Sequence, residues 1–168
     1  IGNVVDPFEL VKKYGVDAVR YFLLREIPTT EDGDFTFEKF ETRHNADLAG
    51  GLGNLVARVI TMAKNSNFKF SNSNQFSNPN FQKETDKTKT NCDAFVNGFK
   101  FNEALGSIWE FIAFCNRYID VERPWEAKQN QKEVISDLLF AIRNITEFIR
   151  PFLPQTSEDI LKQLKENR

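Results

Sequence analysis

The sequence predicts an all-α protein, a bundle of helices joined mostly by short connections. Apolar residues recur at three- and four-residue spacing in several long segments, the period of a helix with one buried face. No segment shows a convincing alternating pattern typical of strands, and no internal repeat is found. Because capping residues, prolines and glycines punctuate these segments closely, neighbouring helices should pack roughly antiparallel.

Two short helices are expected at the start of the chain. Asp6 precedes a proline and a glutamate, which is a capping pattern, and the helix it opens should end at Gly15. Asp17 is expected to cap a second helix over residues 18–26, which Pro28 stops.

A third helix should begin after a polar, turn-rich connection. Thr36 is its expected cap, and Phe35 and Phe40 are spaced to form a hydrophobic staple. This helix is expected to run toward Asn45 and to kink or break before Asp47.

The stretch 45–65 organises the rest of the chain. Its apolar residues follow helical spacing: Leu48, Leu52, Leu55, Val56, Val59, Ile60 and Ala63. Three glycines, at positions 50, 51 and 53, lower the helix propensity, and we expect them to allow the close approach of another backbone.

The second half of the chain predicts four further helices, after a loop at 66–80 that is rich in Ser and Asn. Their expected ranges are 84–98, 102–121, 133–149 and 158–165, with Ser157 as the cap of the last one. The helix 102–121 has the clearest core stripe: Phe101, Leu105, Ile108, Ile112, Cys115 and Ile119.

Length and composition indicate one domain, or one domain with an appendage. The chain has 168 residues, 40% of them hydrophobic and 27% charged, with a net charge of −2. It contains no apolar run that could cross a membrane and no signal-peptide pattern, and its first residue is Ile, so we expect a fragment. The two isolated cysteines indicate a reducing, cytosolic compartment.

No catalytic or metal-binding constellation is recognisable in the sequence. His44 is the only histidine and fits a structural role, while Cys92 and Cys115 are isolated from any paired-ligand motif. The glycine cluster at 50–53 lies inside a helical pattern with no preceding strand, which is not the context of a phosphate-binding loop. We therefore expect no metal site and no catalytic residues in this chain.

Asn54 and Arg58 are the first candidate binding residues. They are four residues apart, so on a helix their side chains are neighbours. An amide beside a guanidinium can address the edge of a nucleobase. By periodicity alone, two polar residues four apart are more often part of a solvent-exposed helix face than of a binding site.

A second candidate is Trp125, which follows a proline just beyond a helix. It is either a hydrophobic plug under the loop or an exposed platform on which a base could stack, and the sequence slightly favours the plug. Arg117, Arg123 and Lys128 surround it and are candidate phosphate contacts. Trp109 lies next to the core stripe of its helix and is expected in the core.

These segments resemble the C-terminal part of bacterial methionyl-tRNA synthetases, which are class I aminoacyl-tRNA synthetases. The resemblance covers nearly the whole chain except 66–80 and rests on four segments: IGNVVDPFELVKKYGVDAVRYFLLREIP, FEKFETRHNADLAGGLGNLVARV, FNEALGSIWEFIAFCNRYIDVERPWEAK and IRPFLPQTSEDIL. GNVVDP is shared with several class I synthetases, whereas REIP, the ADL…LGNL…R pattern and PW together point to methionine.

The resemblance implies a helical bundle of the class I anticodon-binding type that reads the CAU anticodon of tRNA(Met). By match, Asn54 and Arg58 would bind the first anticodon base, and Trp125 would stack on an anticodon base. It also implies a division into a stem-contact connector, 1–28, and an anticodon-binding bundle, 29–168.

The resemblance further implies a catalytic domain upstream in the same chain, which would use ATP and Mg²⁺, with Zn²⁺ in some members. The chain alone should then bind tRNA in the cytoplasm without activating methionine. Two alternatives stay open at this point: the anticodon-binding domain of a leucine- or valine-type synthetase, and a helical module that binds protein.

Overall fold

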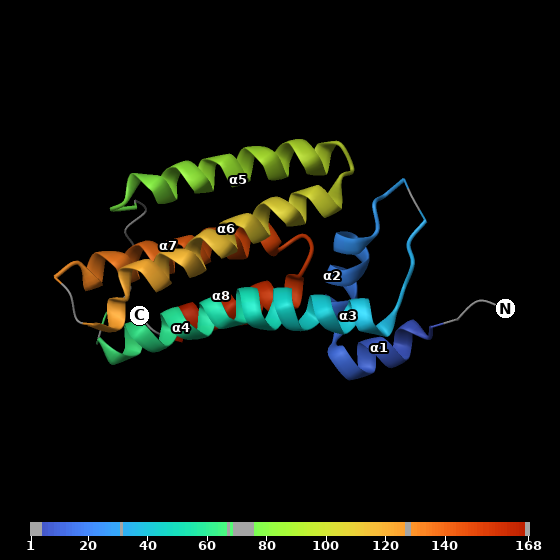
Figure 1. Ribbon diagram of the computed structural model, residues 1–168, viewed down its shortest axis with the longest axis horizontal. Coiled ribbons are helices and arrows are strands. Elements are labelled where there is room, and N and C mark those ends of the chain that lie inside the picture. Colours follow the sequence, from blue (N-terminus) through green and yellow to red (C-terminus); the bar gives the residue numbers. More distant parts are fainter. Residues whose placement is uncertain (1–4, 31, 67, 69–75, 127–128, 167–168) are drawn as a thin grey trace.

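The computed structural model describes residues 5–30, 32–66, 68, 76–126 and 129–166, and every regular element among them is helical (Figure 1). The predicted all-α class is confirmed. In chain order the elements are α1 (Pro7–Tyr14), α2 (Val16–Glu26), α3 (Phe37–Arg43), the π-helix η1 (His44–Gly53), α4 (Asn54–Asn65), α5 (Pro79–Asn97), α6 (Phe101–Glu122), the 3₁₀ turn η2 (Pro124–Glu126), α7 (Gln131–Ile149) and α8 (Pro154–Glu166).

The segments α3, η1 and α4 form one continuous helical rod (Figure 1). Thr36 caps it as predicted, accepting a hydrogen bond from the Lys39 amide at 3.1 Å. The kink or break expected before Asp47 is wrong. The backbone instead widens into a π-helix of ten residues, and His44 and Asn54 at its two ends keep right-handed helical dihedrals.

The main core lies between α4, α6 and α7, and α5 and α8 pack around it. The predicted stripes of α4 and α6 supply much of it. Leu55, Val59, Leu105, Ile108, Cys115 and Ile119 are all fully buried. α1 and α2 gather at one end of the bundle beside α3 (Figure 1), where Phe22 and Phe40 anchor a second, smaller core.

Five helices begin earlier than the sequence suggested, by one residue for α6, by two for α2 and α7, by four for α8 and by five for α5. α5 begins at Pro79 because the Asn78 side chain accepts from the Asn80 amide at 2.9 Å, and a proline suits the first helical position. The assignment of Ser157 as the cap of the last helix was wrong. Ser157 lies inside α8 and donates to the Thr146 carbonyl of α7, 3.1 Å away.

Asp17 does not cap α2, because the helix begins at Val16, directly after Gly15, and so includes Asp17. Its carboxylate reaches across the molecule and accepts a hydrogen bond from the Thr156 amide in the first turn of α8, at 2.7 Å. The first-turn amides of a helix have no partner within that helix. Asp17 therefore caps α8 from another helix.

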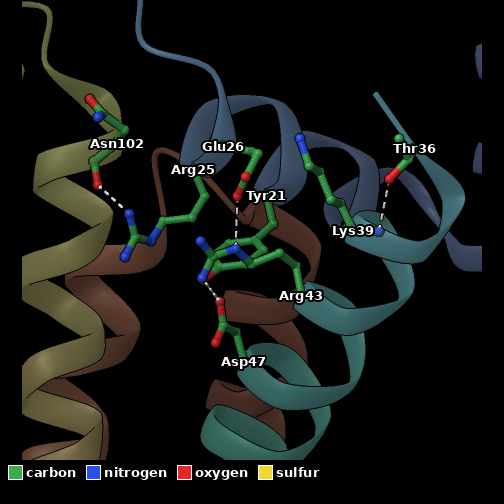
Figure 2. Close-up of polar contacts among 8 residues, drawn as sticks. All are labelled: Tyr21, Arg25, Glu26, Thr36, Lys39, Arg43, Asp47 and Asn102. Carbon is green, nitrogen blue, oxygen red and sulfur yellow. Dashed lines mark hydrogen bonds and ion pairs between the residues drawn. The ribbon is translucent and has the colours of Figure 1, made fainter. Parts of the chain in front are cut away.

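α2 is built into the bundle by three arginine contacts. Arg20 donates to the carbonyls of Phe152 and Pro151, at 2.8 and 3.1 Å, and Arg25 donates to the Asn102 carbonyl at the start of α6 (Figure 2). Tyr21, on the same helix, lies in the main core. Both hydrophobic cores therefore contain residues from each side of residue 28. The separate roles expected of 1–28 and 29–168 stay predictions.

Candidate functional site

An open groove of about 410 Å³ lies between the η1–α4 rod and α6. It is lined from the rod by Ala46, Asp47, Gly50, Gly51, Asn54 and Arg58, and from α6 by Trp109, Ile112, Ala113, Asn116, Arg117 and Asp120. Both residues that the sequence singled out on the organising helix thus face a hollow shared with a second helix, which a plain solvated face would not require.

Arg58 has a defined partner in this groove. Its Nη2 donates to Oδ1 of Asp120, on α6, at 2.7 Å. The Arg58 side chain is 29% exposed and that of Asp120 is 64% exposed, so the pair is open to solvent on one side. A guanidinium has five N–H donors, and most of them stay available for a ligand.

Trp125 lies beside Arg58. The guanidinium carbon of Arg58 is 5.8 Å from the centre of the tryptophan ring, within the range of a cation–π contact. The residue is 54% exposed, so the plug favoured by the sequence is wrong and the ring is open to solvent. The structure therefore brings Arg58 and Trp125 together on one surface, with Asn54 one turn earlier on the same rod.

The turn after α6 explains why Trp125 points outward. α6 ends at Glu122, and Arg123 adopts a left-handed conformation with φ of 46° while its amide still bonds to the Ile119 carbonyl at 2.9 Å. The next residue, Pro124, is buried. The proline, and not the tryptophan, therefore covers the core at this turn.

The candidate phosphate contacts have different surroundings. Arg117 is exposed and lines the groove. Arg123 is exposed and forms an ion pair with Glu126, with 3.5 Å between Nη1 and Oε1. Lys128 lies outside the described residues. The lining of the groove thus carries charges of both signs, from Asp47 and Asp120 and from Arg58 and Arg117.

The floor of the groove was not predicted from the sequence. The Trp109 indole donates to the carbonyl of Asp47, and the Asn116 amide donates to the carbonyl of Gly51, both at 3.2 Å. The signal was present in the polar face of α6, where Trp109, Asn116 and Asp120 recur at helical spacing. At Gly51 the α6 side chains come close, since a Cβ there would lie 3.5 Å from the Trp109 indole nitrogen, whereas Gly50 and Gly53 face carbonyls of their own rod.

One end of the groove is tied to α2 through Asp47. Its Oδ2 accepts from the Tyr21 hydroxyl at 2.7 Å and from Nη1 of Arg43 at 3.3 Å (Figure 2). Arg43 also binds Glu26 at 2.9 Å. Burial, reinforced by the Asp47 carboxylate, raises the pKa of Tyr21, so its hydroxyl stays protonated and remains a donor.

The described residues contain no cluster of three or more His, Cys, Asp or Glu that could hold a metal ion. Within the same ranges, no helix has the length and apolar character needed to span a membrane. His44 packs its ring on Tyr14 and Phe40, with 5.4 and 6.5 Å between ring centres. Cys92 and Cys115 are free and buried.

Two family models match the chain. Residues 1–60 match the model described as tRNA synthetases class I (M), and residues 80–168 match the anticodon-binding domain of tRNA ligase. The first match ends inside α4, so it includes both Asn54 and Arg58, and the second includes the turn that carries Trp125.

Several relatives with similar sequences are methionine–tRNA ligases. Those of Caldanaerobacter subterraneus, Clostridium perfringens and Brucella suis are 39, 40 and 35% identical over 97, 97 and 96% of this chain. The chain spans only 27, 27 and 33% of their lengths. Among solved structures, Mycobacterium tuberculosis methionyl-tRNA synthetase in complex with methionyl-adenylate superposes with a TM-score of 0.85 at 32% identity, covering 96% of this chain and 34% of that one.

Proposed function

This chain belongs to the anticodon-binding domains of tRNA ligases, in the methionyl-tRNA synthetase family, and we propose that it reads the CAU anticodon of tRNA(Met) in the groove between α4 and α6. The observation that carries the proposal is the placement of the Arg58 guanidinium beside the exposed ring of Trp125. One residue offers hydrogen-bond donors to a base edge and the other offers a flat apolar face.

Base recognition follows from the chemistry of Asn54 and Arg58. The pairing edge of cytosine presents two acceptors and one amino donor. Arg58 supplies only donors, and the Asn54 amide supplies both an acceptor and donors, so together they match an edge of mixed character. Arg58 can keep one N–H on Asp120 while others meet the base.

Trp125 is proposed to stack on an anticodon base. Single-stranded loops are recognised through bases that have left the helical stack and rest on aromatic rings or guanidinium planes. Each such contact contributes about 1–3 kcal/mol. Because Trp125 is more than half exposed already, no rearrangement of the core is needed to offer its face.

The net charge of −2 is compatible with this role if base contacts outweigh phosphate contacts. Arg117 and Arg123 are both exposed and are the proposed phosphate contacts, together with Lys128. Few such contacts predict a shallow dependence of affinity on salt concentration, since each phosphate neutralised releases about one counterion.

We propose that the chain acts within a larger enzyme that joins methionine to its tRNA. The chain spans about a third or less of its relatives, and the class I model covers its first 60 residues. ATP, Mg²⁺ and, in some members, Zn²⁺ would act at a catalytic domain of that enzyme, in the cytoplasm. Residues 1–28 would contact the tRNA stem, and 29–168 would supply tRNA selection.

The rival functions are less well supported. A leucine- or valine-type synthetase would not account for relatives that are named methionine–tRNA ligases. A protein-binding helical module would not need an arginine and an exposed tryptophan next to a groove of mixed charge. Quenching of Trp125 fluorescence by cognate tRNA, but not by an unrelated tRNA, separates the RNA-binding function from the protein-binding one.

The test is binding of the chain to two anticodon stem-loops at the same salt concentration. One carries CAU, and the other differs only in its first anticodon base. We expect a clear preference for CAU. Equal binding of the two loops would contradict anticodon reading by this groove.

Arg58→Ala is the decisive variant. Losing its contact to the base should weaken CAU binding by about 1–3 kcal/mol and reduce the preference at the first anticodon base. Arg143→Ala, on α7 and outside the lining of the groove, is the matched control and should change neither quantity. A CAU preference that survives in Arg58→Ala would exclude Arg58 as the reader.

A further inference from the structure

The π-helix η1 immediately precedes the two residues proposed to read the anticodon. η1 occupies His44–Gly53, and Asn54 begins α4. Asn54 itself closes the last π turn, because its amide donates to the Ala49 carbonyl five residues back. Stretches of π-helix are rare, are usually a single turn, and occur often at functional sites.

Winding sets the direction in which later side chains point. In an α-helix each residue turns by about 100°, and a π-helix turns less per residue because it takes more residues per turn. The angular position of Asn54 and Arg58 relative to α3 therefore depends on whether the ten residues before them keep the π winding.

Two glycines fit the wide winding. A Cβ at Gly50 would lie 3.1 Å from the Asn45 carbonyl, and a Cβ at Gly53 would lie 3.1 Å from the Leu48 carbonyl. In each case the crowding atom is the carbonyl five residues earlier in the same rod. Any larger residue at these positions would have to push that carbonyl away, so glycine accommodates the π winding here.

Asp47 holds the same segment from outside. Its carboxylate accepts from Tyr21 of α2 and from Arg43, and its carbonyl accepts from the Trp109 indole of α6. The rings of Tyr21 and Trp109 pack against each other, with 4.5 Å between their centres. Asp47 therefore links the π segment to both α2 and α6 (Figure 2 shows the α2 side).

We infer that η1 sets the register of the anticodon-reading face, with Asp47 and Tyr21 as positioning residues that hold the π winding and thereby aim Asn54 and Arg58 into the groove. This inference rests on the proposed function. It assigns a role to residues that need not touch RNA, and it ties the accuracy of base reading to the packing of α2.

The first test is Gly53→Ala, read as the ratio of affinities for the CAU loop and the loop altered at the first anticodon base. Gly53 is not among the residues that line the α4–α6 groove, so its new methyl group has no direct access to the base there. Gly106→Ala is the matched control, since a Cβ at Gly106 on α6 meets only ordinary contacts at 3.7 Å or more. We expect the ratio to fall about tenfold in Gly53→Ala and to stay unchanged in Gly106→Ala.

The second test is Tyr21→Phe, which removes the hydroxyl donated to Asp47 and keeps the ring that packs on Trp109. We expect a fall in the affinity ratio of about fivefold. The double variant Tyr21→Phe with Asp47→Ala should show the ratio of Asp47→Ala alone, because the hydroxyl acts only through that carboxylate.

The affinity ratio separates positioning from stability. A loss of folded protein lowers both affinities by the same factor and leaves their ratio unchanged. An unchanged ratio in Gly53→Ala and Tyr21→Phe, with a clear CAU preference in the unmodified chain, would overturn the register role and leave the proposed function intact. No CAU preference in the unmodified chain would overturn the proposed function and this inference with it.

Discussion

At the scale of single residues, the central feature of the groove is Arg58, which contacts two other residues. It pairs with Asp120 on α6 and lies beside Trp125, which belongs to the turn after α6. An exposed ion pair contributes little to stability, about 0–1 kcal/mol. The Arg58–Asp120 pair matters here for its geometry, because it holds the long, flexible Arg58 side chain beside the Trp125 ring in the free protein.

Trp125→Ala should weaken binding of the CAU loop by about 1–3 kcal/mol, because a stacking face is lost, and should leave the stability of the fold almost unchanged. The second expectation follows from the 54% exposure of the residue. Binding is measured by fluorescence anisotropy of a labelled stem-loop, and stability is measured by urea unfolding.

Two further variants make this prediction specific. Trp125→Phe keeps an aromatic face and should retain most of the affinity. Phe99→Ala removes another exposed aromatic residue, at the opposite end of α6, and should have no effect on binding. Equal affinities for Trp125→Ala and the unmodified chain would exclude the stacking role.

At the scale of elements, helices depend on residues far away in the sequence. The first turn of α8 is capped by Asp17 of α2, with 2.7 Å between Oδ2 and the Thr156 amide. Asp17 is only 8% exposed, so the hydrogen bond forms where water competes poorly. This contact joins the beginning of the chain to its last helix.

Asp17→Ala should lower the free energy of unfolding by about 1–2 kcal/mol, as for the loss of a helix cap. Asp17→Asn keeps an oxygen acceptor and should cost less. Asp159→Ala, which breaks an exposed pair with Lys162 on the same helix, is the control and should cost at most about 0.5 kcal/mol. The prediction fails if Asp17→Ala and Asp159→Ala have the same effect in denaturant unfolding.

This cap also marks the limit of prediction from sequence. Periodicity identified the helices and their buried stripes, because burial of one face leaves a regular signal. Asp17 was assigned to the nearest helix start, since a sequence shows only local partners, and its true partner lies more than a hundred residues away. Likewise, nothing in a three/four pattern distinguishes π from α winding over residues 44–53.

The candidate site was predictable to a similar degree. Asn54, Arg58 and Trp125 were found from spacing and from a family resemblance, and their use in anticodon reading stays a prediction. The exposure of Trp125 was not predictable, because it depends on Pro124 filling the space below the turn. Asp120 and Asn116 were not predicted, because polar residues on a helix face show the same spacing whether they line a groove or only meet solvent.

At the scale of the whole molecule, tight burial gives several groups the same response to pH. Burial raises the pKa of Cys92 to about 11, with the nearby Asp93 charge adding to the effect, and it also raises the pKa values of Cys115, Tyr21 and Tyr118. All four groups are neutral when protonated. The folded state therefore holds protons that the unfolded chain releases.

The free energy of unfolding should consequently fall as pH rises above about 8.5, the ordinary pKa of a thiol. For Cys92 the stabilising contribution is fully present below that value and is lost as the pH approaches about 11. The loss amounts to at most about 3 kcal/mol for a shift of this size. Denaturant unfolding at a series of pH values between 7.5 and 10.5 measures the slope.

The double variant Cys92→Ala, Cys115→Ala isolates the thiols. Because it removes both buried groups, its stability should fall less steeply between pH 8.5 and 10 than that of the unmodified chain. The same burial should keep both thiols unreactive toward iodoacetamide at pH 8 until the chain is unfolded, since only the thiolate reacts. Identical pH slopes for the two proteins, or rapid alkylation of the folded chain, would show that the core around α6 opens far more readily than its packing indicates.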